Sequence, residues 1–120
     1  YLVDDASVVI QELADEGTDT VLASVDHALS DNVERLTLVG GALVGAGNEG
    51  DNVLVGNGLD NVLYGLGGND RLDGNGLADT LLGGTGDDIY IVDGLGVTIV
   101  EAEGEGIDIV RASVDYTLGD

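Results

Sequence analysis

The sequence predicts an all-β protein, a right-handed parallel β-solenoid built from nonapeptides. Five consecutive nine-residue segments fill residues 47–91 without an insertion. Each begins with glycine, has Asn or Asp at its sixth position and has Leu or Tyr at its eighth. The short apolar pieces between the glycine-rich turns are rich in Val, Leu and Ile, a composition that favours strands.

A strand of about three residues followed by a six-residue turn winds into a flattened coil when it is repeated, with two nonapeptides in each full turn. Equivalent positions of turns two nonapeptides apart then stack at the strand spacing, roughly 4.8 Å. The side chain at the eighth position points into the coil. We therefore expect a core that contains Leu54, Leu63, Leu72, Leu81 and Tyr90, continued by Val21 and Val110.

The apolar pieces have the length and the β-branched content of strands, and Gly, Asn and Asp turns separate them. In chain order the expected strands cover 8–13, 18–24, 34–39, 52–55, 61–64, 70–73, 79–82, 89–92, 97–101 and 108–114. Residues 23–29 also fit a single helical turn, but the counterpart of this segment at 112–118 reads as a strand.

A longer repeat overlies the nonapeptides. Residues 1–31 align without gaps with residues 90–120 at an offset of 89, and about half of the aligned positions are identical. We therefore interpret the chain as a piece of a longer tandem array whose stacked units bury a continuous core. The expected organisation is a strand-rich flank at 1–46, the five nonapeptides at 47–91 and the start of the next long repeat at 92–120.

Both flanks contain degenerate nonapeptides. Gly17 with Asp19, and Gly106 with Asp108, keep the fourth and sixth positions of the motif. Asp88 and Asp108 are 20 residues apart, two more than two nonapeptides.

The chain is strongly acidic, with 24 Asp and Glu against 3 Arg and a formal net charge of −21. A compact chain of that charge repels itself, and the abundant aliphatic residues argue against disorder. Neutralisation by bound cations is therefore expected, whereas nucleic acid and anionic membrane surfaces are disfavoured as partners. The absence of Cys excludes disulfides and thiolate metal sites. Without an apolar run of about 18 residues, we expect no membrane insertion.

The sixth-position carboxylates point to the kind of cation. In stacked turns they lie almost on top of one another, and unit charges about 4 Å apart repel by several kcal/mol at an intermediate dielectric constant. A cation between them turns the repulsion into a binding site. Six to eight oxygen ligands at roughly 2.3–2.6 Å suit calcium, and glycine-rich turns allow backbone carbonyls to complete the set.

The segments GLGGNDRLD at 65–73 and GGTGDDIYI at 83–91 follow the pattern GGxGxDxUx best. This pattern resembles the hemolysin-type calcium-binding repeat of RTX (repeat-in-toxin) proteins. The resemblance implies a β-roll in which each calcium ion lies between a turn and the turn two nonapeptides later. The earlier turn contributes the carbonyls of its second and fourth residues and its sixth-position Asp. The later turn contributes the carbonyls of its first and third residues and its own Asp.

The resemblance implies four sites in this sequence. The best match combines Leu66, Gly68 and Asp70 with Gly83, Thr85 and Asp88. A neighbouring site on the same edge combines Asn48, Gly50 and Asn52 with Gly65, Gly67 and Asp70. On the opposite edge, Asn57, Leu59 and Asn61 face Gly74, Gly76 and Asp79. A fourth site combines Gly84, Gly86 and Asp88 with Glu103, Glu105 and Asp108, if the two-residue insertion is absorbed.

Two departures from the pattern weaken some of these sites. Leu59 and Leu77 replace the fourth-position glycine, and a leucine resists a positive φ. We therefore expect the opposite-edge site to be distorted or empty. Asn52 and Asn61 offer a neutral oxygen in place of a carboxylate. They either bind calcium more weakly or stack as hydrogen-bonded caps.

The sequence offers no catalytic site. His27 is the single histidine, its neighbour Asp26 points to the opposite face of a strand, and the second copy has Tyr116 in its place. The resemblance implies a calcium-folded segment of a large secreted bacterial protein, exported by type I secretion to the medium or the cell surface. Two roles remain open: part of a structural or adhesive repeat array, or an accessory module beside a secreted protease, lipase or polysaccharide-modifying enzyme. A polysaccharide or cell-surface partner is a further alternative.

Overall fold

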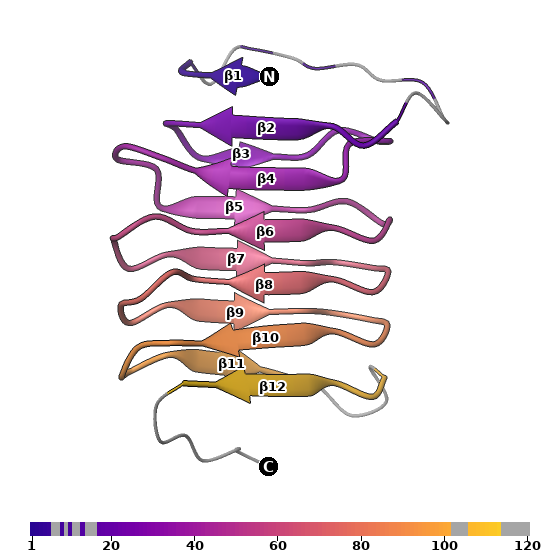
Figure 1. Cartoon of the computed structure of the whole chain (residues 1–120). Coiled ribbons are helices and arrows are strands. Elements are labelled where there is room, and N and C mark those ends of the chain that lie inside the picture. The colour runs from indigo at the N-terminus through magenta and orange to yellow at the C-terminus, as the bar shows by residue number, and fades with distance from the viewer. Residues whose placement is uncertain (6–7, 9, 11–12, 14–16, 102–105, 114–120) are drawn as a thin grey trace.

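A computed structural model describes residues 1–5, 8, 10, 13, 17–101 and 106–113. Within this part the chain is all-β, with parallel strands arranged as a solenoid of about six turns and no helix (Figure 1). The strands are β1 (Leu2–Val3), β2 (Thr20–Ala23), β3 (His27–Ala28), β4 (Arg35–Leu38), β5 (Val44–Ala46), β6 (Val53–Val55), β7 (Val62–Tyr64), β8 (Arg71–Asp73), β9 (Thr80–Leu82), β10 (Ile89–Val92), β11 (Thr98–Val100) and β12 (Ile109–Ala112). The described residues accordingly provide no helical segment able to cross a membrane.

The strands alternate between two parallel sheets. The larger sheet has the order β1-β2-β4-β6-β8-β10-β12, and the smaller sheet has the order β11-β9-β7-β5-β3. In the larger sheet Leu54 pairs with Leu72, and in the smaller sheet Leu63 pairs with Leu81. Each pair is separated by two nonapeptides, which confirms the predicted winding.

The register departs from this spacing at both flanks. Val21 of β2 pairs with Leu36 of β4, only 15 residues later. Tyr90 of β10 pairs with Val110 of β12, 20 residues later. The two-residue insertion before Asp108 is therefore absorbed in the connection, and the strands keep their stacking.

The core follows the eighth position of the nonapeptides, as predicted. Six of its predicted members are fully buried, at 0% exposed: Val21, Leu54, Leu63, Leu72, Leu81 and Tyr90. Val110 is partly buried and packs against this cluster. From β6 to β10 one eighth-position side chain per strand fills the narrow interior between the two sheets, and β10 adds the buried Val92.

Most of the expected strands are present, with three differences. β1 and β5 were not expected, and residues 23–29 contribute the short strand β3 rather than a helical turn. The expected strand at 8–13 lies largely outside the described residues.

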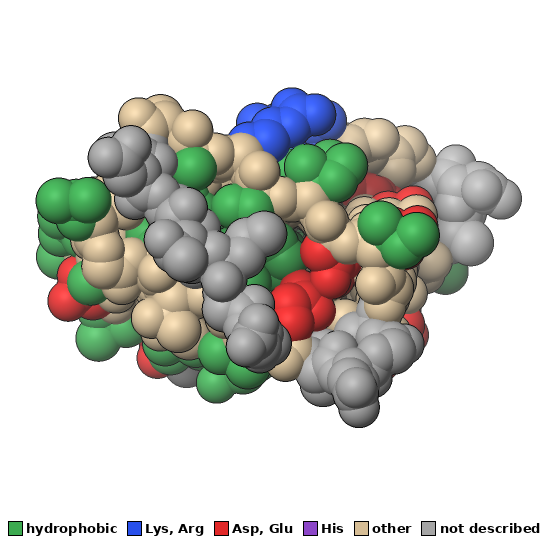
Figure 2. Space-filling model, turned by 90° about the horizontal axis from the view of Figure 1, so that it is seen from below, with side chains coloured by type: hydrophobic (Ala, Val, Ile, Leu, Met, Phe, Trp, Pro, Cys, Tyr) green, Lys and Arg blue, Asp and Glu red, His purple; other side chains and the backbone are tan. Residues whose placement is uncertain are grey.

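The turns of the solenoid lie at two edges. We call the edge formed by turns 47–52, 65–70 and 83–88 the first edge, and the edge formed by turns 56–61 and 74–79 the second edge. In Figure 1 they are at the right and at the left. Figure 2, seen from the C-terminal end, shows Arg side chains on one outer face, carboxylates toward the first edge and hydrophobic side chains at the second edge. All three Arg residues of the chain lie on the larger sheet, in β4, β8 and β12.

Candidate calcium site

The sixth-position side chains form a hydrogen-bonded column along the first edge. Each aspartate in the column accepts the backbone N–H of the equivalent residue one turn earlier. Asp70 Oδ1 accepts from Asn52 at 2.7 Å and Asp88 Oδ1 accepts from Asp70 at 2.8 Å. Asp108 Oδ1 accepts from Asp88 at 2.6 Å. The strand register therefore brings the sixth-position residues of four successive turns together.

Buried carboxylate oxygens mark the places where a cation is needed. Asp70 Oδ2 and Asp79 Oδ2 are buried and have no hydrogen-bond partner among the described residues. Burial raises the pKa of Asp70 to about 7, an effect that the Asn52 N–H opposes and the negative charge of Asp88 reinforces. Burial also raises the pKa of Asp79. An ionised carboxylate in such a place is costly unless a counter-charge is present.

The first-position glycines keep a space open next to these oxygens. A Cβ atom on Gly65 would stand 2.5 Å from both Asp70 Oδ2 and the carbonyl oxygen of Gly83. On the second edge, a Cβ on Gly74 would collide with Asp79 Oδ2. Carboxylate and carbonyl oxygens thus converge from two stacked turns, with no nitrogen or sulfur ligand among them. This donor set fits calcium.

The structure brings the six residues of the best-matching site into two adjoining turns. The carbonyl oxygen of Leu66 faces Gly84 and accepts the N–H of Thr85 at 2.9 Å. The carbonyl oxygen of Gly68 faces Gly86 in the same way. Together with Asp70, Asp88 and Gly83, these groups line the gap between turns 65–70 and 83–88. Their role as calcium ligands stays a prediction.

The backbone of the carboxylate-bearing turns depends on left-handed residues, but not always on glycine. Turn 83–88 uses Gly84 (φ 86°) and Gly86 (φ 107°). Turn 65–70 uses Leu66 (φ 78°) in place of the first of these glycines. L-residues rarely adopt this conformation because Cβ crowds the following carbonyl.

The second-edge turns differ from the carboxylate-bearing first-edge turns in where the backbone is left-handed. In turn 74–79 the left-handed residues are Asn75 (φ 67°) and Gly76 (φ 118°), so Leu77 has no positive φ. Leu59 also lacks one, because none of the residues in turn 56–61 has a positive φ. The second-edge turns therefore have a different backbone from the first-edge pattern, and neither leucine is strained.

The two N-terminal turns are closed by asparagine side chains. Asn48 Nδ2 donates to the carbonyls of Ser30 (2.7 Å) and Val33 (2.9 Å). Asn52 Nδ2 donates to Val33 (3.2 Å) and Glu34 (3.4 Å). Amide hydrogens thus occupy a carbonyl-lined gap of the kind in which a cation would otherwise lie.

Nine residues later the same arrangement recurs at the second edge. Asn57 Nδ2 donates to the carbonyls of Gly40 (3.3 Å) and Ala42 (2.8 Å). Asn61 Nδ2 donates to Ala42 (3.2 Å) and Leu43 (3.4 Å). Both sixth-position asparagines thus make the hydrogen bonds of the capping alternative, and weak calcium binding by them stays a prediction.

Two of the other predicted sites each join one of these asparagines to a carboxylate. The N–H of Asn61 donates to Asp79 Oδ1 at 2.8 Å, as that of Asn52 does to Asp70. Both asparagine Oδ1 atoms already accept a backbone N–H, from Asn57 at 2.9 Å and from Asn48 at 2.8 Å. On the second edge the column then ends, since the next sixth-position residue after Asp79 is the buried Val97.

A second hydrogen-bonded column runs outside the first. Asp51 Oδ1 accepts the N–H of Asn69 at 2.8 Å, and Asn69 Oδ1 accepts that of Asp87 at 2.9 Å. Asp87 Oδ1 accepts that of Ile107 at 2.9 Å. The sequence analysis missed this column, although the recurrence of Asp or Asn at the fifth position was a visible signal.

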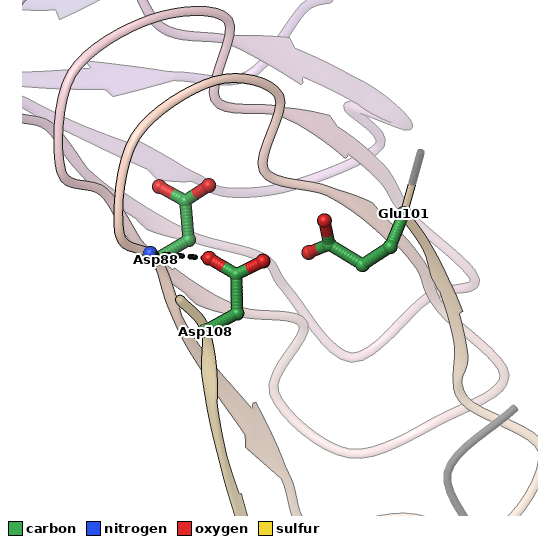
Figure 3. A group of neighbouring side chains, drawn as sticks. All are labelled: Asp88, Glu101 and Asp108. Carbon is green, nitrogen blue, oxygen red and sulfur yellow. Dashed lines mark hydrogen bonds between the residues drawn. The ribbon is translucent and has the colours of Figure 1, made fainter. Parts of the chain in front are cut away.

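The last turn of the first edge adds a carboxylate that the sequence analysis also missed. Oxygens of Asp88, Glu101 and Asp108 lie within 4.8 Å of one another (Figure 3). The Tyr90 hydroxyl donates to Glu101 and accepts the N–H of Gly83 at 2.9 Å. Burial and the hydrogen bond to Glu101 raise the pKa of Tyr90, so it stays protonated. Two members proposed for this site from the sequence, Glu103 and Glu105, lie outside the described residues.

Comparison with protein families gives a match to the RTX calcium-binding nonapeptide repeat (4 copies), over residues 46–81, 73–89 and 78–94. Comparisons with curated proteins and with solved structures gave no match. The matched range covers the five nonapeptides and both columns as far as Asp87 and Asp88. The repeat segment of this chain, residues 46–94, is therefore a member of the RTX calcium-binding nonapeptide repeat family.

Proposed function

We propose that the chain is a calcium-folded β-roll segment of a large secreted bacterial protein, and that it stiffens a structural or adhesive repeat array outside the cell. The observation that carries this proposal is the buried Oδ2 of Asp70, which has no hydrogen-bond partner within residues 1–5, 8, 10, 13, 17–101 and 106–113 and lies beside Gly65 and the carbonyl oxygen of Gly83. A calcium ion beside that oxygen supplies the charge that the carboxylate lacks. The ion also links two stacked turns whose carboxylates repel each other in spite of the backbone hydrogen bonds between the turns.

Calcium binding of this kind couples to folding. Where the site does not exist in the unfolded chain, binding free energy adds directly to folding free energy. RTX repeats are characteristic of extracellular proteins exported by type I secretion. Extracellular calcium modules work at about 10⁻⁴–10⁻³ M, so the turns of such a segment that carry buried carboxylates stay unfolded in the cytosol and fold after export. Its partners are then calcium ions and neighbouring repeats of the same protein.

The long repeat favours an array over an accessory module beside an enzyme. A module that only assists the folding of a catalytic domain needs one block of nonapeptides. Here the sequence begins a second 89-residue unit after the first, and both units contribute strands to one sheet. This is the arrangement that a load-bearing or spacing element requires.

The test is a calcium titration of the chain followed by far-UV circular dichroism. We expect a calcium-dependent gain of β signal that magnesium does not reproduce, since magnesium demands a smaller and more rigid octahedral shell. Asp70→Asn should shift the midpoint to higher calcium. Asp31→Asn removes the same charge from an exposed position and should leave the midpoint almost unchanged. A β signal that is already complete in chelator would contradict calcium-dependent folding.

A further inference from the structure

The boundary between the two copies of the long repeat lies inside a strand. At the offset of 89 the first copy ends at Ile89 and the second begins at Tyr90. Both residues belong to β10, which spans Ile89–Val92. The two copies are therefore joined without a linker.

The equivalent strands of the two copies are paired in the same register. In the first copy Leu2 pairs with Leu22 and Val3 pairs with Ala23. In the second copy Ile91 pairs with Arg111 and Val92 pairs with Ala112. Every one of these four positions has moved by 89 residues, and the 20-residue separation within each pair is unchanged.

The hydrogen bonds repeat with the register. The N–H of Ser24 donates to the carbonyl of Val3 at 2.8 Å, and the N–H of Ser113 donates to that of Val92, also at 2.8 Å. The strand pair β1–β2 is thus the structural equivalent of the pair β10–β12.

One difference separates the two pairs, and it concerns what lies on their N-terminal side. β10 is covered by β8, with Tyr90 paired to Leu72 and 0% exposed. Its equivalent Tyr1 is 55% exposed. In the second copy, β8 occupies the side of β10 that corresponds to the side of β1 away from β2.

The opposite end of the roll is complementary. A hollow of about 270 Å³ is lined by Ile91, Val92, Asp93, Arg111, Ala112 and Ser113. At the equivalent place in the first copy, Val39 donates its N–H to the carbonyl of Ala23 at 2.8 Å. A Cβ on Gly40 would touch the Cβ of Ser24 at 3.4 Å. The turn that follows β4 thus covers in the first copy what is hollow in the second.

From these observations we propose that each end of the roll is a docking surface for another copy of the 89-residue unit. Tandem units then form one uninterrupted solenoid, with shared sheets and a shared core, rather than separate domains on linkers. The proposal rests on the repeat array proposed above and specifies its architecture. From β1 to β10 the larger sheet advances by five strand steps, which corresponds to about 24 Å per unit at a spacing of 4.8 Å.

The test is a tandem chain in which residues 1–89 are followed directly by a second copy of residues 1–120. The proposal places β1 of the second copy where β10 lies here, so that Leu2 of the second copy pairs with Asp73 of the first, as Ile91 does in this chain. The protein contains no cysteine, and directly opposed residues of neighbouring strands lie within disulfide reach. We expect Asp73→Cys in the first copy and Leu2→Cys in the second to form a disulfide in high yield in calcium.

Two matched pairs calibrate this result. Asp73→Cys with Ile91→Cys in the present chain tests the equivalent pairing inside the roll and should form the same disulfide. Asp73→Cys in the first copy with Val3→Cys in the second is one residue out of register, and Val3 points into the core, so this pair should stay reduced. A failed junction disulfide beside a successful internal one would overturn the proposal.

Small-angle scattering of the unmodified tandem chain gives a second readout. The maximum dimension should exceed that of the single chain by about 24 Å, and thermal unfolding should remain one transition. Two independently unfolding bodies would overturn the proposal. Circular dichroism separates its failure from that of calcium-dependent folding. If the β signal proves independent of calcium while the junction disulfide forms, only the proposed calcium-dependent folding is wrong.

Discussion

Two groups of turns occupy the same place in the same solenoid but are closed by different chemistry. We call turns 47–52 and 56–61 the amide turns, and turns 65–70, 74–79 and 83–88 the carboxylate turns. Asn52 and Asp70 are both 2% exposed and stand at the same position of consecutive first-edge turns. The Asn52 amide donates to the carbonyls of the preceding turn, whereas Asp70 Oδ2 has no hydrogen-bond partner in the described part of the chain.

From this difference we expect calcium dependence to be a property of individual turns and not of the fold. Strand register and core are continuous from the amide turns to the carboxylate turns, since Leu54 pairs with Leu72 as Leu36 pairs with Leu54. Where an oxygen replaces the NH₂ group, we expect the turn to require a cation. Under the proposed function, the roll is closed by hydrogen bonds at its N-terminal side and by calcium farther along.

The largest expected effect is therefore a difference in protection between the two groups of turns when calcium is removed. In chelator, the amide hydrogens of β4, β5 and β6 should remain protected from exchange, whereas those of β8 and β10 should exchange rapidly. The reason is that uncompensated buried carboxylates lower the free energy of local unfolding only where they occur. Residue-resolved hydrogen exchange, with and without calcium, measures this. Uniform loss of protection along the whole roll would show that the amide turns have no stability of their own.

Lowering the pH should stabilise the carboxylate turns of the calcium-free protein, as calcium does, but less strongly. Burial raises the pKa of Asp70 in the folded chain to about 7, against roughly 3.9 in an unfolded chain. The folded state therefore holds a proton that the unfolded state has lost between these values. This contribution to stability is complete below pH ~4 and disappears as the pH rises through about 7.

Calcium-free protein should accordingly have a larger free energy of unfolding at pH 5 than at pH 8, which denaturant titration can measure. Asp70→Asn should reduce the difference, leaving the part due to Asp79, whose pKa burial also raises. With calcium present the order reverses, because protons compete with the ion for the same carboxylates. Equal stability of the calcium-free protein at both pH values would contradict the burial of an ionisable Asp70.

Replacing an amide by a carboxylate at the sixth position should lower the free energy of unfolding by a moderate amount. Asn52→Asp removes both hydrogen bonds to Val33 and Glu34 and brings a carboxylate oxygen against their carbonyls. Unfolding of the calcium-free protein should become easier by about 2 kcal/mol, and saturating calcium should recover part of the loss. Asp51→Asn, at the adjacent exposed position, keeps a side-chain oxygen for the N–H of Asn69 and serves as the control. No destabilisation by Asn52→Asp would mean that the amide hydrogen bonds are dispensable.

The sequence was sufficient for the parts of the molecule that follow the nine-residue period. The core residues, the strands from β6 to β10 and the stacking of Asp70 on Asp88 all follow from it. The partners of the Asn52 amide did not follow, because the carbonyls of Val33 and Glu34 belong to a segment outside the regular repeat. Glu101 was missed for the same reason: its approach to Asp88 depends on how the two-residue insertion is absorbed.

Backbone conformation was predicted with less success, because the sequence shows which residues tolerate a positive φ but not which must adopt it. Leu59 and Leu77, which resist a positive φ, have none, and their turns differ from the first-edge backbone as expected. In turn 74–79 the left-handed conformation moved to Asn75 and Gly76. The leucine that does adopt it is Leu66, at a second position where the following first-edge turn has Gly84.

This contrast gives the smallest of the predicted effects and the best matched pair of variants. Leu66 and Leu77 are about equally exposed, at 44% and 49%, so either side chain loses little packing on removal. Leu66→Gly relieves a left-handed conformation that costs an L-residue about 1–2 kcal/mol, against about 0.5–1 kcal/mol for the greater freedom of glycine in the unfolded chain. Leu77→Gly also gives the unfolded chain more freedom, but it relieves no left-handed conformation. We expect Leu66→Gly to raise the free energy of unfolding in calcium slightly and Leu77→Gly to lower it, with about 1–2 kcal/mol between the two variants in denaturant titrations. Equal destabilisation by both would mean that turn 65–70 holds Leu66 without strain, and that its second position does not require glycine.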